Sequence, residues 1–165
     1  MGRRRWLDLL TAAIIVGCLF GIARLMRETR FAGNAVAVDG DTLVMEGRRI
    51  RLRGIDAPEL SQTCRKGGET YRCGFEARAA VRALIAGETV TCAVRGRDRF
   101  FRDLATCEAR GQDIGANLVR RGLAVSFGGY EDEEREAREA RRGLWAGTFE
   151  TPQIWRREHE TGHRP

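Results

Sequence analysis

The chain of 165 residues is poor in histidine and has no closely spaced cysteine pair. Its two histidines, His159 and His163, lie near the C-terminus, and no Cys-x-x-Cys motif occurs. Structural zinc sites use four cysteine or histidine ligands at short spacings, so the sequence disfavours a zinc centre. Internal repeats and low-complexity tracts are also absent, which argues against repeat architectures.

Lysine is scarce as well, because Lys66 is the only one among 29 basic residues. The net charge of +6 is divided along the chain. Residues 1–26 hold four arginines against one aspartate, a net of +3, and the remainder holds 25 basic against 22 acidic residues, also +3. Net charge alone therefore does not identify a nucleic-acid partner, and the positions of the charges matter more.

No uncharged stretch reaches the ~20 apolar residues that usually span a bilayer. The longest, Leu9 to Ala23, has 15 residues and follows a basic start. A span from Trp6 to Met26 is long enough if the charged side chains near its ends reach the interfaces. We expect residues 1–30 to form an uncleaved signal anchor with a short linker, so that the protein is exported and membrane-anchored with its domain on the periplasmic or extracellular side. A cleaved signal peptide, giving a secreted form, and a lipoprotein signal at Cys18 are the alternatives.

Four further cysteines fall into two pairs along the chain. Cys64 and Cys73 flank a polar loop, whereas Cys92 and Cys107 lie in two apolar runs typical of neighbouring strands. The even number favours two local disulfides over reduced thiols, although the sequence alone does not fix the connectivity. Disulfides would indicate an oxidising compartment.

Short apolar alternations predict strands rather than long helices in the first half of the domain. The predicted strands cover residues 32–38, 42–45, 49–53, 89–94 and 104–108, and the predicted helices cover 74–86, 113–121 and 130–142. This order predicts an α+β fold, a five-stranded OB-fold β-barrel with flanking α-helices. We assign it to residues 31–149 and treat residues 150–165 as a tail.

Acidic and basic residues meet where three of these predicted strands end. Asp41 lies in V-D-G-D-T, Asp56 and Glu59 lie in I-D-A-P-E, and Arg51 precedes the second motif on the same strand. Carboxylate oxygens at one rim of a barrel suit Ca²⁺ or Mg²⁺, while arginine forks bind phosphate oxygens bidentately. With Arg102 from the next hairpin, the pattern indicates phosphoryl chemistry.

These motifs together resemble the thermonuclease family, the relatives of staphylococcal nuclease. VDGDT, IRLRGIDAPE, DRFFR, LVRRGLA and GLW occur in the family's order between about Ala32 and Trp145. The resemblance implies an OB fold and Ca²⁺-dependent, endonucleolytic cleavage of DNA and RNA that leaves 3′-phosphate ends. Mg²⁺ or another divalent ion is the alternative cofactor.

Residue roles follow from the same resemblance, position by position. Asp41 and Asp56 would bind the metal through their carboxylates and Ala57 through its carbonyl, with Thr42 beside the ion and Asp39 supporting it.

The catalytic group implied by the resemblance has three members. Glu59 would be the general base or water-positioning residue, and Arg51 and Arg102 would contact the phosphate and the transition state.

Two departures from the family pattern concern the substrate. Phe101 stands where a glycine usually precedes the second catalytic arginine, and the nucleotide-pocket tyrosines are poorly represented. Arg99, Phe100 and Tyr130 are the candidate substrate-binding residues, since aromatic rings stack on bases.

The expected partners are DNA and RNA, with single strands preferred, and the membrane through the N-terminal segment. We expect the protein to be a monomer. A noncatalytic OB-fold nucleic-acid-binding module at the membrane is the first alternative function. A metal-stabilised interaction module that uses the charged helix over 130–142 is the second. Glu59 argues against a pure binder, because a carboxylate repels phosphate.

Overall fold

A computed structural model describes residues 14–17 and 29–159 of the chain. The predicted signal anchor falls mostly on residues outside these ranges, with 14–17 described as helical. Among the described residues, no helix combines the length and apolar character needed to cross a bilayer.

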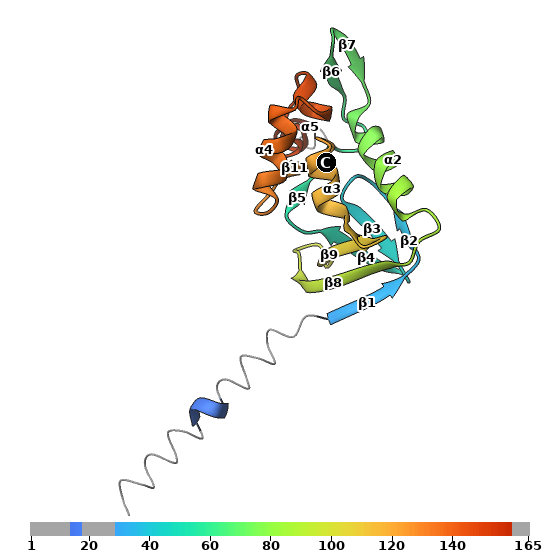
Figure 1. The fold of residues 1–165 in the computed structure, drawn as a ribbon, viewed down its shortest axis with the longest axis vertical. Coiled ribbons are helices and arrows are strands. Elements are labelled where there is room, and N and C mark those ends of the chain that lie inside the picture. Colours follow the sequence, from blue (N-terminus) through green and yellow to red (C-terminus); the bar gives the residue numbers. More distant parts are fainter. Residues whose placement is uncertain (1–13, 18–28, 160–165) are drawn as a thin grey trace, which may run out of the picture.

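The largest element is a seven-stranded mixed sheet, which curls beneath the helices in Figure 1. Its strands are β1 (Thr29–Gly33), β2 (Ala35–Ala37), β3 (Thr42–Met45), β4 (Arg48–Leu52), β8 (Val90–Arg97), β9 (Asp103–Ala109) and β10 (Gln112–Asp113). The order is β1-β8-β9-β4-β3-β2, with β10 paired to β9. All pairs are antiparallel except β4 with β9.

The sheet departs from the five predicted strands at its first and last members. The segment predicted as one strand over 32–38 divides at Asn34 into β1 and β2. These two halves pair with opposite ends of the sheet, since β1 joins β8 and β2 joins β3. One bent segment therefore connects the two edges of a curled sheet. The α+β class is confirmed, whereas the count of five strands was wrong.

Buried apolar residues alternate with more exposed residues along the strands, and the buried ones form the core beneath the site. Ile50 and Leu52 of β4 are buried, whereas Arg49 of the same strand is exposed. The pattern continues in β9, where Ala105 and Cys107 are buried. Burial of apolar surface on this scale is the main stabilising contribution to such a domain.

The helices agree with the sequence in position more than in length. They are α2 (Cys73–Ile85), α3 (Ile114–Arg120), α4 (Glu131–Glu139), the 3-10 helix η1 (Gly143–Ala146) and α5 (Pro152–His159). Asp113, the first residue of the helix predicted over 113–121, is the N-cap of α3, because its side chain accepts a hydrogen bond from the Ala116 N–H at 3.0 Å. The helix predicted over 130–142 ends at Glu139, and α5 occupies the segment expected to be a tail.

Two smaller sheets and two disulfides complete the fold. The hairpin of β6 (Cys64–Lys66) and β7 (Glu69–Tyr71) stands away from the main sheet in Figure 1. The pair β5 (Ile55–Asp56) and β11 (Val125–Ser126) lies between the sheet and the C-terminal helices. Disulfides join Cys64 to Cys73 and Cys92 to Cys107, which confirms the predicted local pairs.

Candidate active site

The turn between β2 and β3 holds Asp41 through its own backbone. One carboxylate oxygen of Asp39 accepts hydrogen bonds from the N–H groups of Asp41, at 3.0 Å, and Thr42, at 2.6 Å. Gly40 packs so closely that a Cβ there would lie 2.6 Å from the Ala57 Cβ, so no larger residue fits without movement. The turn is thus pressed against the segment that carries Asp56.

Arg51 joins the two aspartates. It lies opposite Thr42 in the β3–β4 register, and its guanidinium donates to Asp41 and, at 2.7 Å, to Asp56. Both aspartates are buried, at 3% and 2% exposure. The Ala57 N–H donates to the other oxygen of Asp41 at 2.9 Å. Two carboxylates from different turns therefore converge on one arginine.

Burial gives Asp41 an unusual protonation equilibrium. The pKa of Asp41 is raised to about 7, mainly because desolvation by burial outweighs the attraction of Arg51, with the nearby charge of Asp39 contributing to the rise. A carboxylate in this position is stabilised by a proton or by another cation.

These oxygens fit a hard divalent cation. Asp41 and Asp56 supply carboxylates and Thr42 supplies a hydroxyl, which lies 3.2 Å from the carboxylate of Asp41. Across residues 14–17 and 29–159, no group of three or more His, Cys, Asp and Glu side chains is arranged to hold a metal. A bound ion would therefore need hydroxyl, carbonyl or water oxygens beside the two aspartates, as Ca²⁺ accepts.

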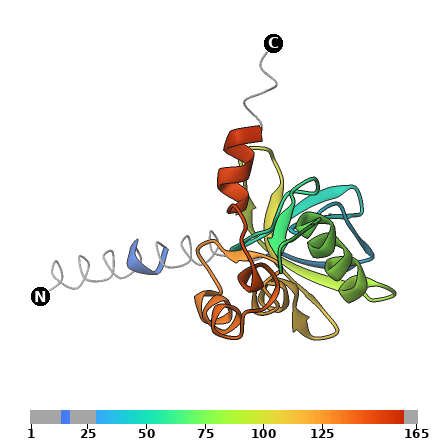
Figure 2. The same cartoon turned by 90° about the horizontal axis from the view of Figure 1, so that it is seen from above.

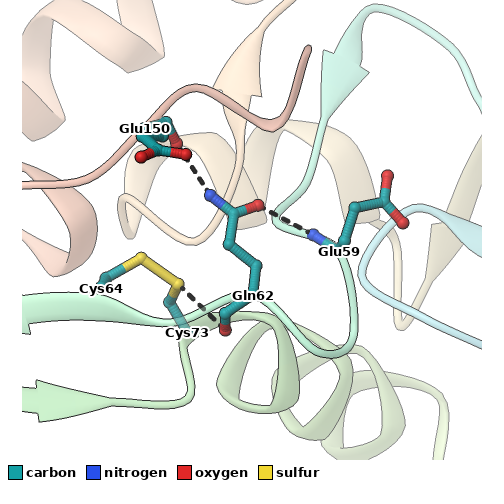
Figure 3. Close-up of a disulfide and its surroundings, with 5 residues drawn as sticks. All are labelled: Glu59, Gln62, Cys64, Cys73 and Glu150. Atoms are coloured by element: carbon teal, nitrogen blue, oxygen red, sulfur yellow. Dashed lines mark hydrogen bonds between the residues drawn. A yellow bond between two sulfur atoms is a disulfide. The ribbon is translucent and has the colours of Figure 1, made fainter. Parts of the chain in front are cut away.

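Glu59 stands on a turn that one buried side chain fixes. Gln62 is fully buried. Its side-chain oxygen accepts a hydrogen bond from the Glu59 backbone N–H at 3.1 Å, and the backbone N–H of Gln62 donates to the Glu59 carbonyl oxygen at 2.8 Å. Figure 3 shows the Glu59 carboxylate on the far side of the turn from the Gln62 amide. The first turn of α2 presses on the same place, because a Cβ on Gly74 would lie 1.7 Å from the Glu59 carbonyl oxygen.

Arg102 reaches the site from the β8–β9 loop. Its Nε donates to Asp98 at 2.7 Å, and its Nη1 lies 3.4 Å from the Thr42 hydroxyl. Burial alone would raise the pKa of Asp98, but hydrogen bonds from the Arg102 side chain and backbone lower it. Phe101 is 84% exposed and has a φ of 60°. Its ring therefore points into solvent, in a left-handed conformation that glycine adopts more readily.

The structure adds two residues that the sequence did not single out. Gln62 lies outside every strand and helix predicted from the sequence, and no local pattern marks a buried amide of this kind. Arg156 was assigned to the tail, yet its guanidinium contacts Asp56 and Glu59. The signal for its helix was Pro152 at the first helical position, where proline is common.

The three candidate substrate-binding residues are not equally placed. Arg99 and Phe100 are exposed next to Arg102, with the Arg102 guanidinium 5.6 Å from the Phe100 ring centroid. Tyr130 is half-buried, and its hydroxyl donates to Asp113 at 2.8 Å. Its ring lies against Gly54 and Gly115. A substrate role for any of the three stays a prediction.

Comparison with known proteins gives the family. Residues 49–147, more than half of the chain, match the family described as staphylococcal nuclease homologue. The chain belongs to this family. Membership confirms the predicted relation to the thermonucleases and supports the predicted class of enzyme, a nuclease.

The relatives of this staphylococcal nuclease homologue differ in how much of their own length is matched by this chain. It is 36% identical over 137 residues to an "Uncharacterized endonuclease" of Escherichia coli O157:H7, across 75% of this chain and 84% of that protein. It is 34% identical over 136 residues to "Probable staphylococcal-like nuclease CAN2" of Oryza sativa subsp. japonica, across 78% of this chain and 34% of the relative. The "Succinoglycan biosynthesis protein ExoI" of Rhizobium meliloti (strain 1021) is 36% identical over 121 residues, across 68% of this chain and 63% of the relative. The chain thus spans less than two thirds of the last two.

Proposed function

We propose that this chain is a Ca²⁺-dependent nuclease that hydrolyses phosphodiester bonds of DNA and RNA endonucleolytically and leaves 3′-phosphate ends. The observation that carries the proposal is the convergence of Asp41, Asp56 and Arg51, with Glu59 on the adjoining turn and Arg102 beside Thr42. The curled sheet would serve as an OB-type barrel that presents these groups at one rim. The nuclease relatives support the assignment.

Each protein group has a task that its geometry suits. Glu59 accepts a proton from the attacking water as the water oxygen bonds to phosphorus. The bond from phosphorus to the 5′ oxygen breaks, and that oxygen takes up a proton as it leaves. Arg51 and Arg102 stabilise the charge that develops on the nonbridging oxygens, at about 3 kcal/mol for each such donor.

A divalent ion would be held by Asp41 and Asp56, with the Ala57 carbonyl and Thr42 beside it. When bound, it would add positive charge against the phosphate and help to orient the water. Without such an ion, Arg51 is the cation that both aspartates contact.

The setting of the enzyme is part of the proposal. The two disulfides support an exported protein, because disulfides persist in oxidising compartments. We place the domain on the periplasmic or extracellular side, anchored by the N-terminal segment, as a monomer that prefers single strands. Thiol counting on protein from its own host tests the compartment, since four reactive thiols in the folded domain would contradict export.

Cleavage assays on the full chain test the activity. Purified protein is incubated with single-stranded DNA and with RNA, in Ca²⁺, in Mg²⁺ and in a chelator, and the product ends are mapped. We expect cleavage in Ca²⁺, none in chelator, and 3′-phosphate ends. Folded protein that binds the strands but cleaves under no condition would instead be the noncatalytic binding module.

A further inference from the structure

Helix α5 lies beyond residue 147, where the family match ends, and brings an additional arginine to the site. Arg156 donates from Nη1 to Asp56 Oδ1 at 3.0 Å and from Nη2 to Asp56 Oδ2 at 2.9 Å. Nη1 also donates to Glu59 at 2.7 Å. The contacts join residues about 100 positions apart in the chain. Figure 2 shows α5 (red) as the last helix, set apart from α4.

The segment that precedes α5 is bonded to the turn that carries Glu59. The Gln62 side chain accepts from the Glu59 N–H and donates from Nε2 to the Glu150 carbonyl at 2.8 Å. Figure 3 shows Gln62 between these two residues. Because Gln62 is fully buried, the segment that precedes α5 is bonded to the interior of the site. Arg156 is therefore presented to the carboxylates by a defined connection.

Arg156 repeats the arrangement of Arg51. Each guanidinium contacts two of the three site carboxylates, and both contact Asp56. Burial alone would lower the pKa of Arg156, but its hydrogen bonds to Asp56 and Glu59 outweigh burial and raise the pKa. Arg156 stays charged, and its side chain is 27% exposed. Substrate can therefore approach it from solvent.

We propose that Arg156 is a substrate-binding residue of the active site, one that exchanges the carboxylates for a phosphate oxygen of the nucleic acid. The inference rests on the proposed function. A phosphate that comes within reach of a water on Glu59 also comes within reach of Arg156, whose Nη1 is 2.7 Å from the Glu59 carboxylate. The planar fork that now spans both oxygens of Asp56 matches two phosphate oxygens equally well.

A phosphate contact of this kind predicts a particular kinetic change. The contact forms on binding and persists in the transition state, so its loss raises KM and leaves kcat nearly unchanged. Arg156→Ala is expected to raise KM for single-stranded DNA about tenfold, which corresponds to about 1.4 kcal/mol. Arg156→Lys keeps the charge without the planar fork, so its KM should lie between those of the parent and of Arg156→Ala.

The experiment compares four full-length proteins: the parent, Arg156→Ala, Arg156→Lys and Arg135→Ala. Arg135 is a charge-matched control, because it pairs with Asp132 on its own helix. Thermal melts establish that each variant is folded. Cleavage of a short fluorescent DNA strand in Ca²⁺ gives kcat and KM, and fluorescence anisotropy of the same strand in chelator gives its dissociation constant across a salt series.

The two readouts decide the inference separately from the function. We expect weaker binding by Arg156→Ala in chelator and a salt slope lower than that of the parent by about 0.7, the value for one phosphate contact on a single strand. Unchanged KM and an unchanged slope would overturn the inference while leaving a nuclease. A lower KM with a higher kcat/KM would also overturn it, because α5 would then block the site. If the parent binds but does not cleave, the proposed activity fails and the salt slope still reports on Arg156.

Discussion

Glu59 is held by its backbone, whereas its carboxylate is 32% exposed and pairs with a side chain from the other end of the domain. The two backbone hydrogen bonds to Gln62 do not involve the carboxylate. Chemistry at the carboxylate and order of the turn can therefore be separated by substitution.

Glu59→Gln should remove most of the turnover and leave stability nearly intact. The amide cannot accept a proton from water, and general-base catalysis contributes about 10²–10⁴-fold. The melting temperature should stay near that of the parent, because a partly exposed ion pair contributes little. Single-turnover cleavage and thermal melts check both parts, with Glu139→Gln on exposed α4 as the control. Full activity in Glu59→Gln would mean that another group acts on the water.

At the residue scale, local motifs predicted more than distant contacts. The convergence of Asp41, Arg51 and Asp56 could be expected from the sequence because they lie within 15 positions of one another on adjacent strands and turns. Arg156 could not, because its partners lie 97 and 100 positions away and no periodic pattern encodes that approach.

Helix α2 packs closely against the turn that carries Glu59, at Gly74. Gly74→Ala should displace the turn, since the added Cβ would meet the Glu59 carbonyl oxygen and neither backbone can yield cheaply. We expect a loss of about 2–3 kcal/mol in the free energy of unfolding, within the range for overpacking, and reduced cleavage at temperatures where the variant is folded.

Gly47→Ala is the comparison for Gly74→Ala. Gly47 has a φ of +77° and open space around its Cβ position, so that variant incurs only backbone strain, remote from Glu59. Denaturant unfolding and cleavage assays of both variants test the idea. Equal activities for the two would show that the Gly74 contact does not position Glu59.

Asp103 ties β4, β8 and β9 together through Arg48 and Arg97, at 2.8 and 2.9 Å. Burial alone would raise the pKa of Asp103, but hydrogen bonds from Arg97 and Arg48 lower it below its ordinary value of 3.8. The stabilisation is therefore present above about pH 3.8 and is lost as the pH falls through the lower, folded-state pKa.

Asp103→Asn should accordingly cost about 2 kcal/mol near neutral pH, the scale of a hydrogen bond to a charged group. The difference from the parent should shrink in acid, where the parent carboxylate is also protonated. Urea unfolding at neutral pH and in acid measures the change, with exposed Asp132→Asn as the control. A difference that does not vary with pH would exclude the ionised carboxylate as its source.

Element boundaries were predictable where a single residue marks them. Asp113 signalled the start of α3, and its capping hydrogen bond is present. The helix predicted over 130–142 runs three residues past the end of α4 at Glu139. Arg141 already has a left-handed φ of 49°, and no residue pattern in the sequence marks that change of direction. Asn34 divides the first strand for a reason that only the closed path of the sheet reveals: each half pairs with a different neighbour.

At the scale of the whole molecule, the two disulfides should have different consequences. Cys92 and Cys107 face each other across β8 and β9 in the core, whereas Cys73 opens α2 with its sulfur 3.5 Å from the Gln62 carbonyl oxygen. Replacing either pair by serine should cost about 3 kcal/mol. Only the Cys64–Cys73 replacement should also lower cleavage, because it loosens the support of Glu59.

Thermal melts and cleavage rates, measured well below both melting temperatures, test this difference. Each double variant is the control for the other, because the sequence separations of 9 and 15 change the expected loop-closure contribution by only about 0.5 kcal/mol. Equal loss of activity in the two would show that the bridges act only through global stability.

The bend at Asn34 between β1 and β2 also affects pairing between the sheets of separate molecules. Exposed sheet edges can template pairing between chains and start aggregation. In the part of the chain that the structure describes, the strand order of the main sheet ends at β1, with five residues, and at β2, with three, while β10, which pairs with β9 off this path, has two. Because β1 and β2 belong to the segment bent at Asn34 and β10 is shorter still, none of the three offers a long, flat strip of unpaired backbone. The same bend that brings the ends of the sheet together thus makes the domain a poor template for strand addition, which favours solubility at high local concentration.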